Sequence, residues 1–229
     1  MGSRQDHRGR PRAAARPRLQ PLTGPPIGRA RTVEVDPQRL DRWFAGFAER
    51  HGPYDATEES TPGGVVRDAR AADGATARTE PFGHDPLGVV LVRRGGYAVG
   101  LAHGAALTAS KVGTRHVQSR TAAGGWSQQR FARRRGKQAD ELVDAVVAHT
   151  RRLLLGDDES PPAGAPHVPR GLVVGGDRIL VREVLDAPAL RALGGLPRRE
   201  LYDLPDPRRD VLEAALRRGR AVRITVTDP

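Results

Sequence analysis

The stretch Gly88-Val-Val-Leu-Val-Arg-Arg-Gly-Gly-Tyr-Ala-Val-Gly-Leu101 decides the fold of this chain. Its first apolar run, Gly88–Arg93, has the length and the valine content of a buried strand, and a second run begins at Tyr97. The pair Gly95–Gly96 predicts a two-residue turn between the runs, so the second run returns antiparallel to the first. A third strand over Ala105–Ser119 is expected to complete a meander.

A long helix is predicted to follow this meander. Phe131, Ala139 and Leu154 belong to a series of apolar residues at helical spacing, and Gly156 predicts the end of the helix. The residues that lead into this helix, Thr121–Gln129, are expected to form a basic, glycine-containing loop.

Strand and helix signals alternate in the rest of the chain. The predicted elements are a core strand over Arg170–Gly176, a helix in one or two pieces over Ile179–Leu193, a short strand over Tyr202–Leu204, a helix from Asp206–Pro207 to Gly219, and a strand over Val222–Val226. This order predicts an α/β fold on a mixed sheet, and an RNase H-like layout with flanking helices fits it.

The chain is expected to divide into three parts. Residues 1–30 contain Arg, Pro and Gly without apolar periodicity, which predicts a disordered basic tail. Residues 31–85 are expected to form a strand, a helix and a loop region, and residues 86–229 the main domain.

The part from 31 to 85 begins with two clear signals. Thr32–Val35 predicts a short strand, and Asp36–Pro37 predicts the start of an amphipathic helix. From residue 53 the sequence is weakly patterned, so we expect mostly loop, with a turn at Asp73–Gly74 inside a marginal strand pair.

Positive charge is confined to two segments of the chain. The 229 residues carry a formal net charge of +11. Residues 1–30 contain seven Arg and one acid, Asp6, while residues 111–137 contain eight basic residues and no acid. Confined positive charge is typical of surfaces that bind polyanions, and nucleic acid is the polyanion that we expect.

The composition argues against several classes of function. The chain has no Cys and no apolar stretch long enough to cross a membrane, and its first residues lack the apolar core of a secretory signal, so we expect a cytoplasmic protein. Residues 88–120 contain no Asp or Glu, which argues against a two-metal nuclease. The seven His show no ligand spacing, and no nucleotide-binding or dinucleotide-binding motif is present, so neither a metal nor a cofactor is expected.

One group of residues has the chemistry of a catalytic loop tip. Gly124–Gly125 precedes Trp126-Ser-Gln-Gln129, and basic residues flank the group on both sides. Paired glycines allow a close approach of the backbone, and an uncharged Gln offers one acceptor and two donors. Such a tip can orient a water molecule and present N–H groups to an oxyanion.

The stretch Gly88–Leu155 resembles the middle domain of the eukaryotic and archaeal class-1 peptide-chain release factors. Gly124–Gly125 and Arg130-Phe-Ala-Arg133 stand where that family has its Gly-Gly-Gln loop and the start of the following helix. At the glutamine position this chain has Trp126. If Trp126 is an insertion, Ser127–Gln128 matches the Gly-Gly-Ser-Gln loop of the Vms-type release factors, and the arginine-rich composition is similar to that of their actinobacterial branch.

The resemblance implies hydrolysis of the ester between a nascent peptide and the 3′ end of tRNA on stalled large ribosomal subunits. Gln128 is expected to position the water, with Gln129 as the alternate, on a tip that includes Gly124, Gly125 and Ser127. The expected partners are the large ribosomal subunit and peptidyl-tRNA, bound by a monomer. The residues expected to contact RNA are Lys111, Arg115, Arg120, Trp126, Arg130, Arg133, Arg134, Arg135 and Lys137.

Two other functions stay open. A non-catalytic protein of the same fold would use the basic loop only to dock on the ribosome or on RNA. A peptidyl-tRNA hydrolase that acts in free solution would not need ribosomal subunits.

Overall fold

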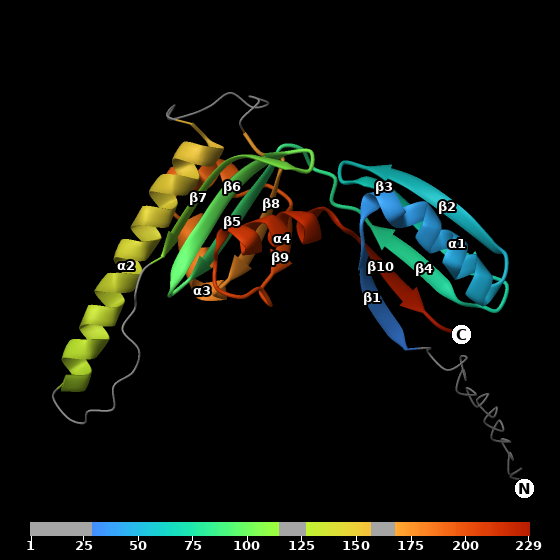
Figure 1. Ribbon diagram of the computed structural model, residues 1–229, viewed down its shortest axis with the longest axis horizontal. Helices are drawn as coiled ribbons and strands as arrows, with labels where there is room; N and C mark the ends of the chain where they lie inside the picture. The colour runs from blue at the N-terminus through green and yellow to red at the C-terminus, as the bar shows by residue number, and fades with distance from the viewer. Residues whose placement is uncertain (1–28, 115–126, 157–167) are drawn as a thin grey trace, which may run out of the picture.

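The chain forms two five-stranded sheets. A computed structural model describes residues 29–114, 127–156 and 168–229, with the backbone alone for residues 127–137. The first sheet has the strand order β1-β10-β4-β3-β2 and the second has the order β7-β6-β5-β8-β9 (Figure 1). The predicted mixed α/β class with flanking helices is confirmed, and the RNase H-like assignment stays a prediction.

The second sheet contains the predicted meander. Its strands are β5 (Leu87–Arg93), β6 (Gly96–His103), β7 (Ala106–Thr114), β8 (Gly171–Gly176) and β9 (Arg198–Leu201). The first three pair antiparallel in sequence order, and β8 and β9 run parallel to β5, so the sheet is mixed as predicted. The part of the predicted third strand beyond Thr114 lies outside the described residues.

Helices cover both faces of the second sheet (Figure 1). Side chains alternate along β5, so that Val90 and Val92 pack under α2 (Ser127–Leu154), α3 (Arg178–Leu185) and the 3-10 helix η2 (Pro188–Leu193), whereas Val89 and Leu91 pack under α4 (Arg209–Arg220). This arrangement explains why β5 has no polar side chain from Leu87 to Val92: neither face of this part of the strand meets water.

Three boundaries differ from the prediction. The turn between β5 and β6 is Arg94–Gly95, because Arg93 pairs with Gly96. The last strand of this sheet, β9, precedes the predicted Tyr202–Leu204. Helix α4 starts at Arg209, and Gly219 lies inside it instead of ending it.

The first sheet is built from the ends of the chain. It contains β1 (Ala30–Val35), β2 (Tyr54–Thr61), β3 (Gly64–Ala71), β4 (Thr76–Glu80) and β10 (Val222–Thr227), and α1 (Leu40–His51) follows the 3-10 helix η1 (Pro37–Arg39). The expected loop after residue 53 is therefore wrong, although the predicted turn at Asp73–Gly74 does join two paired strands. The predicted disorder of residues 1–30 falls on residues that lie, up to residue 28, outside the described part.

Small side chains on the first sheet make room for the aromatic side chains of α1. Ala69, Ala71 and Ala77 are buried beneath Phe44 and Phe47 in one apolar cluster. Because alanine gives little hydrophobic contrast, the strands β3 and β4 carry only a weak alternating signal in the sequence.

The terminal strand joins the two halves of the molecule. After α4 on the second sheet, β10 enters the first sheet between β1 and β4. Residues 86–229 thus contribute strands to both sheets. Among the described helices, none is both long enough and apolar enough to span a lipid bilayer.

Candidate functional site at the start of helix α2

The predicted catalytic glutamines lie in the first turn of helix α2. This helix begins at Ser127, so Ser127, Gln128 and Gln129 belong to the helix and not to the preceding loop as expected. No residue between Ser127 and Phe131 breaks a helix, and Gln and Arg are good helix formers, which accounts for the earlier start. Five other predicted site residues lie outside the described residues: Arg115, Arg120, Gly124, Gly125 and Trp126.

The packed part of α2 begins well after its first residue. The helix has 28 residues and a length of about 42 Å. Its described apolar contacts with the second sheet begin at Ala139, so the preceding twelve residues extend about 18 Å before that point. Figure 1 shows this yellow-green end of α2 beyond the edge of the sheet.

Apolar side chains at helical spacing hold the rest of α2 on the sheet. Leu142, Val146 and Leu154 are buried against β6, α3 and η2. Gly156 ends the helical region with a φ of 79°, as predicted from the sequence. The anchored half therefore fixes the direction in which the first turns of α2 point.

A polar cluster holds the same half of the helix. The imidazole of His149 stacks on the ring of Tyr97 with their centroids 5.4 Å apart, and Arg152 Nη2 donates to His149 Nδ1 at 3.1 Å. Burial lowers the pKa of His149, and the nearby charges of Arg152 and Lys111 lower it further. His149 is therefore neutral at pH 7 and can accept this bond.

The sequence analysis did not single out His149 and Arg152. Their spacing of three residues within the predicted helix is the signal that could have found the pair, because such residues are neighbours on a helix surface.

The first turns of α2 carry cations and no acid. The cations on this helix segment are Arg130, Arg133, Arg134, Arg135 and Lys137. The first acid of the helix is Asp140, which lies in the packed part. Lys111, also predicted to contact RNA, lies apart from them on β7, where its side chain is exposed.

Backbone chemistry adds to this charge. The first four N–H groups of an α-helix have no partner within the helix, and the aligned peptide dipoles place partial positive charge at that end. The start of α2 thus combines N–H donors, glutamine amides and five cations on one segment. Such a segment suits contact with phosphates and with a developing oxyanion.

Within the described ranges, no group of three or more His, Asp or Glu side chains is placed to hold a metal ion.

A known protein family matches the part of the chain that contains the second sheet and α2. The family model of the Actinobacteria/chloroflexi VLRF1 release factor matches residues 85–225, which run from the start of β5 into β10. A search of the curated proteins finds no match to the chain. The matched range covers more than half of the sequence and includes the whole second sheet and the start of α2. The chain belongs to the Actinobacteria/chloroflexi VLRF1 release factor family.

Proposed function

We propose that this protein hydrolyses the ester of peptidyl-tRNA on stalled large ribosomal subunits, with Gln128 positioning the attacking water. Membership of a release factor family supports a role in releasing peptide during translation. The proposed partners are the large subunit and peptidyl-tRNA, and the protein acts as a monomer in the cytoplasm.

The start of α2 is the observation that carries the proposal. A catalytic group that works inside the ribosome must reach a site surrounded by RNA. The twelve residues of α2 before Ala139 form about 18 Å of helix, and Figure 1 shows this end of α2 beyond the edge of the sheet. Gln128 lies in the first turn of that helix, three residues after Gly125 in the sequence.

The reaction needs a positioned water and a stabilised oxyanion. Water attacks the carbonyl carbon of the ester, the bond from that carbon to the ribose oxygen breaks, and a proton from the water passes to the leaving oxygen. The products are a peptide carboxylic acid and the free 3′ end of tRNA. The amide of Gln128 orients the water without taking its proton, and backbone N–H groups at the tip stabilise the oxyanion.

The two neighbouring glutamines are not equivalent on a helix. Successive Cα atoms are about 100° apart around the helix axis, so Gln128 and Gln129 are directed differently. Gln128 is our choice for the catalytic residue, and Gln129 is the alternate.

The basic residues are proposed to hold the tip against RNA. The five cations of residues 127–137 would contact rRNA and tRNA phosphates, together with Arg115, Arg120 and Lys111. Trp126, next to the glycine pair, would stack on a base. Phosphate contacts of this kind position the protein on the RNA, and the residues at the start of α2 carry out the hydrolysis.

Peptide release from two substrates tests the proposal. Labelled peptidyl-tRNA is supplied either bound to isolated large subunits or free in solution, and release by the wild-type protein is measured. We expect rapid release from the subunits and little from the free substrate. Equal release from both would favour a hydrolase that acts in free solution, and tight binding to subunits without release would favour a docking protein; either result contradicts the proposal.

A further inference from the structure

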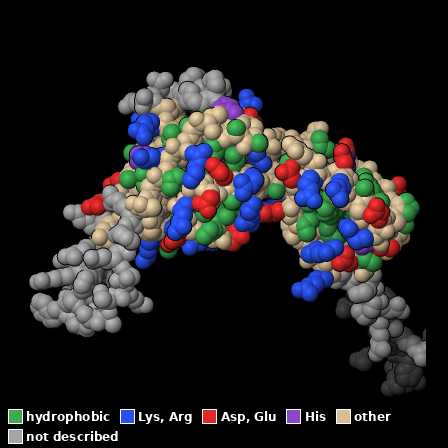
Figure 2. Space-filling view, viewed as in Figure 1, with side chains coloured by type: hydrophobic (Ala, Val, Ile, Leu, Met, Phe, Trp, Pro, Cys, Tyr) green, Lys and Arg blue, Asp and Glu red, His purple; other side chains and the backbone are tan. Residues whose placement is uncertain are grey.

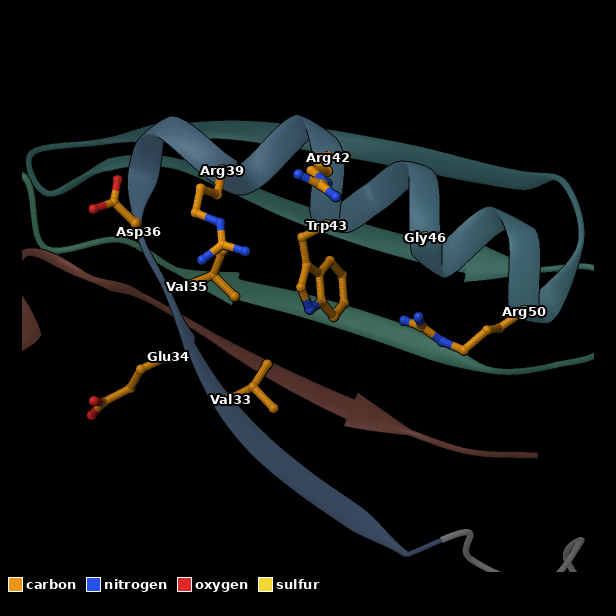
Figure 3. A pocket seen from close by; sticks show the side chains of 9 residues that line it. All are labelled: Val33, Glu34, Val35, Asp36, Arg39, Arg42, Trp43, Gly46 and Arg50. Carbon is orange, nitrogen blue, oxygen red and sulfur yellow. The ribbon is translucent and has the colours of Figure 1, made fainter.

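A groove lies between α1 and the outer strand of the first sheet. It has a volume of about 410 Å³ and is lined by nine residues from Val33 to Arg50. Its floor includes Val33 and Val35 of β1, and Trp43 of α1 lies over them (Figure 3). Among the described strands β1 pairs with β10 alone, so the groove runs along the edge of the sheet.

Three arginines in this groove have no acidic partner. Within the described residues, Arg39, Arg42 and Arg50 form no hydrogen bond, ion pair or ring contact, and all three are exposed. Figure 2 shows Lys and Arg side chains bordering an apolar patch on this half of the molecule. The groove thus presents three guanidinium groups that form no ion pair with a described acid.

The two acids at the groove are already engaged. Glu34 Oε2 accepts from Arg218 Nε at 2.8 Å, and Asp36 Oδ1 accepts from the backbone N–H of Gln38 at 2.9 Å. Glu34 is thus neutralised by Arg218, whereas Asp36 keeps its negative charge and, among the described residues, forms no ion pair with the three arginines. The side chains that line the groove therefore keep a surplus of positive charge for a ligand.

Trp43 adds a flat aromatic surface between the charges. Its indole stacks on Phe47 with the centroids 5.7 Å apart and the planes 13° apart, and it meets the edge of Phe44 at 5.0 Å. These contacts fix the orientation of the ring. In Figure 3 the indole lies between the side chains of Arg39 and Arg50.

The guanidinium of Arg50 lies over Gly46, on the groove side of α1 (Figure 3). A Cβ at Gly46 would lie 3.4 Å from Arg50 Nη1, which is an ordinary van der Waals contact.

We infer that this groove binds single-stranded RNA, with one base against Trp43 and the flanking phosphates on Arg39, Arg50 and Arg42. A fixed aromatic ring between cations is the arrangement that binds single strands, because every base has a flat face and every linkage carries a charge. The groove volume lies within the range of roughly 300–1,000 Å³ that is typical of sites for small ligands, so one nucleotide fits.

This surface is separate from the start of α2. Apart from the terminal strand β10, the first sheet lies outside the range matched by the family model. RNA binding in the groove therefore holds or fails independently of peptide release.

A fluorescence experiment isolates the groove. The chain has two tryptophans, so Trp126→Phe leaves Trp43 as the sole reporter in the full-length protein. A base that stacks on the indole quenches its emission. Titration with a short oligouridine is expected to quench Trp43 with a saturating curve, and polyglutamate of similar charge is expected to leave the emission unchanged.

Charge variants test the same site with a labelled oligouridine. Arg39→Ala with Arg50→Ala is expected to weaken binding at least about tenfold and to lower the slope of log affinity against log salt by about 1.4, since each phosphate contact on a single strand contributes roughly 0.7. The matched control is Arg94→Ala with Arg191→Ala. These two exposed arginines lie outside the groove and have no described partner, so their removal should leave the affinity for oligouridine within about twofold of that of the wild type.

Conservative replacement of the ring completes the test. Trp43→Phe keeps an aromatic face and should retain most of the affinity for labelled oligouridine, whereas Trp43→Ala should lose about tenfold or more. Unquenched Trp43 emission, equal affinity of the two double variants, or displacement of oligouridine by polyglutamate would overturn the inference.

Discussion

Gly219 sets the distance between helix α4 and the second sheet. A Cβ at this position would lie 2.3 Å from Cγ2 of Val173, a buried residue of β8. The sequence suggested that Gly219 ends the helix, because glycine is common just past helix ends. The residue instead lies in the last turn, where its missing side chain lets the helix backbone approach the strand.

Gly219→Ala is therefore expected to destabilise the protein. The clash with Val173 should cost roughly 1–3 kcal/mol, which outweighs the gain of about 1 kcal/mol in helix propensity. Urea unfolding measures the change. Gly195→Ala is the matched control, because nothing lies within 4 Å of a Cβ there.

A second substitution tests the cause of that loss. Val173→Ala removes the methyl groups that the new Cβ would meet, so Gly219→Ala should cost less stability in that background than in the wild type. Equal costs in the two backgrounds would show that the contact with Val173 is not the reason for glycine at this position.

At the scale of elements, the sequence predicted those segments whose burial is strongly patterned. The anchored part of α2 was visible because Leu142, Val146 and Leu154 repeat at helical spacing and all three are buried. The start of the helix was not visible, because the predicted apolar series begins at Phe131 and the four residues from Ser127 to Arg130 include no apolar side chain that would mark the period. The same rule explains the second sheet, whose strand β5 has no polar side chain from Leu87 to Val92 because both its faces are covered.

In the first sheet, β1 and β10 were predicted, but β2 was missed and β3 and β4 were expected only as a marginal pair, for the opposite reason. Strand β2 is largely exposed, and β3 and β4 bury mainly alanines beneath α1, so neither hydrophobicity nor alternation marks them strongly. The two candidate sites differ in the same way, because one was visible in the sequence and the other was not. The sequence motif pointed to the residues at the start of α2, whereas the groove around Trp43 depends on β1 and α1 meeting in space and on Glu34 being neutralised by Arg218 of α4.

At the scale of the whole molecule, Arg199 joins the two sheets. Its side chain is almost fully buried, and it donates from Nη1 to the carbonyl of Ala221 at 2.8 Å and from Nη2 to the carbonyl of Glu80 at 3.1 Å. The guanidinium also lies 5.0 Å from the ring centroid of Phe82. The guanidinium of Arg199, a residue of β9, thus hydrogen-bonds the backbone carbonyl of the last residue of β4 and the backbone carbonyl just before β10. Its partners are too distant in sequence for any local pattern to reveal them.

Arg199→Met should weaken the whole fold. The substitution keeps much of the side-chain volume but leaves two carbonyl groups without their charged donor, which should cost about 2–4 kcal/mol. Chemical unfolding followed by circular dichroism measures this loss. Arg191→Met, at an exposed arginine without a described partner, should change stability by less than about 0.5 kcal/mol. A similar effect of both substitutions would contradict the role given to Arg199.

The account rests on a glutamine at the start of α2, and the rate of peptide release from large subunits tests it most directly. We predict that Gln128→Ala lowers this rate by about 10²–10³ while subunit binding is retained, because one preorganised donor has an effect of that size. Gln138→Ala, a matched change in the same helix, should leave the rate close to that of the wild type. Release at the wild-type rate by a protein with both Gln128→Ala and Gln129→Ala would contradict the account.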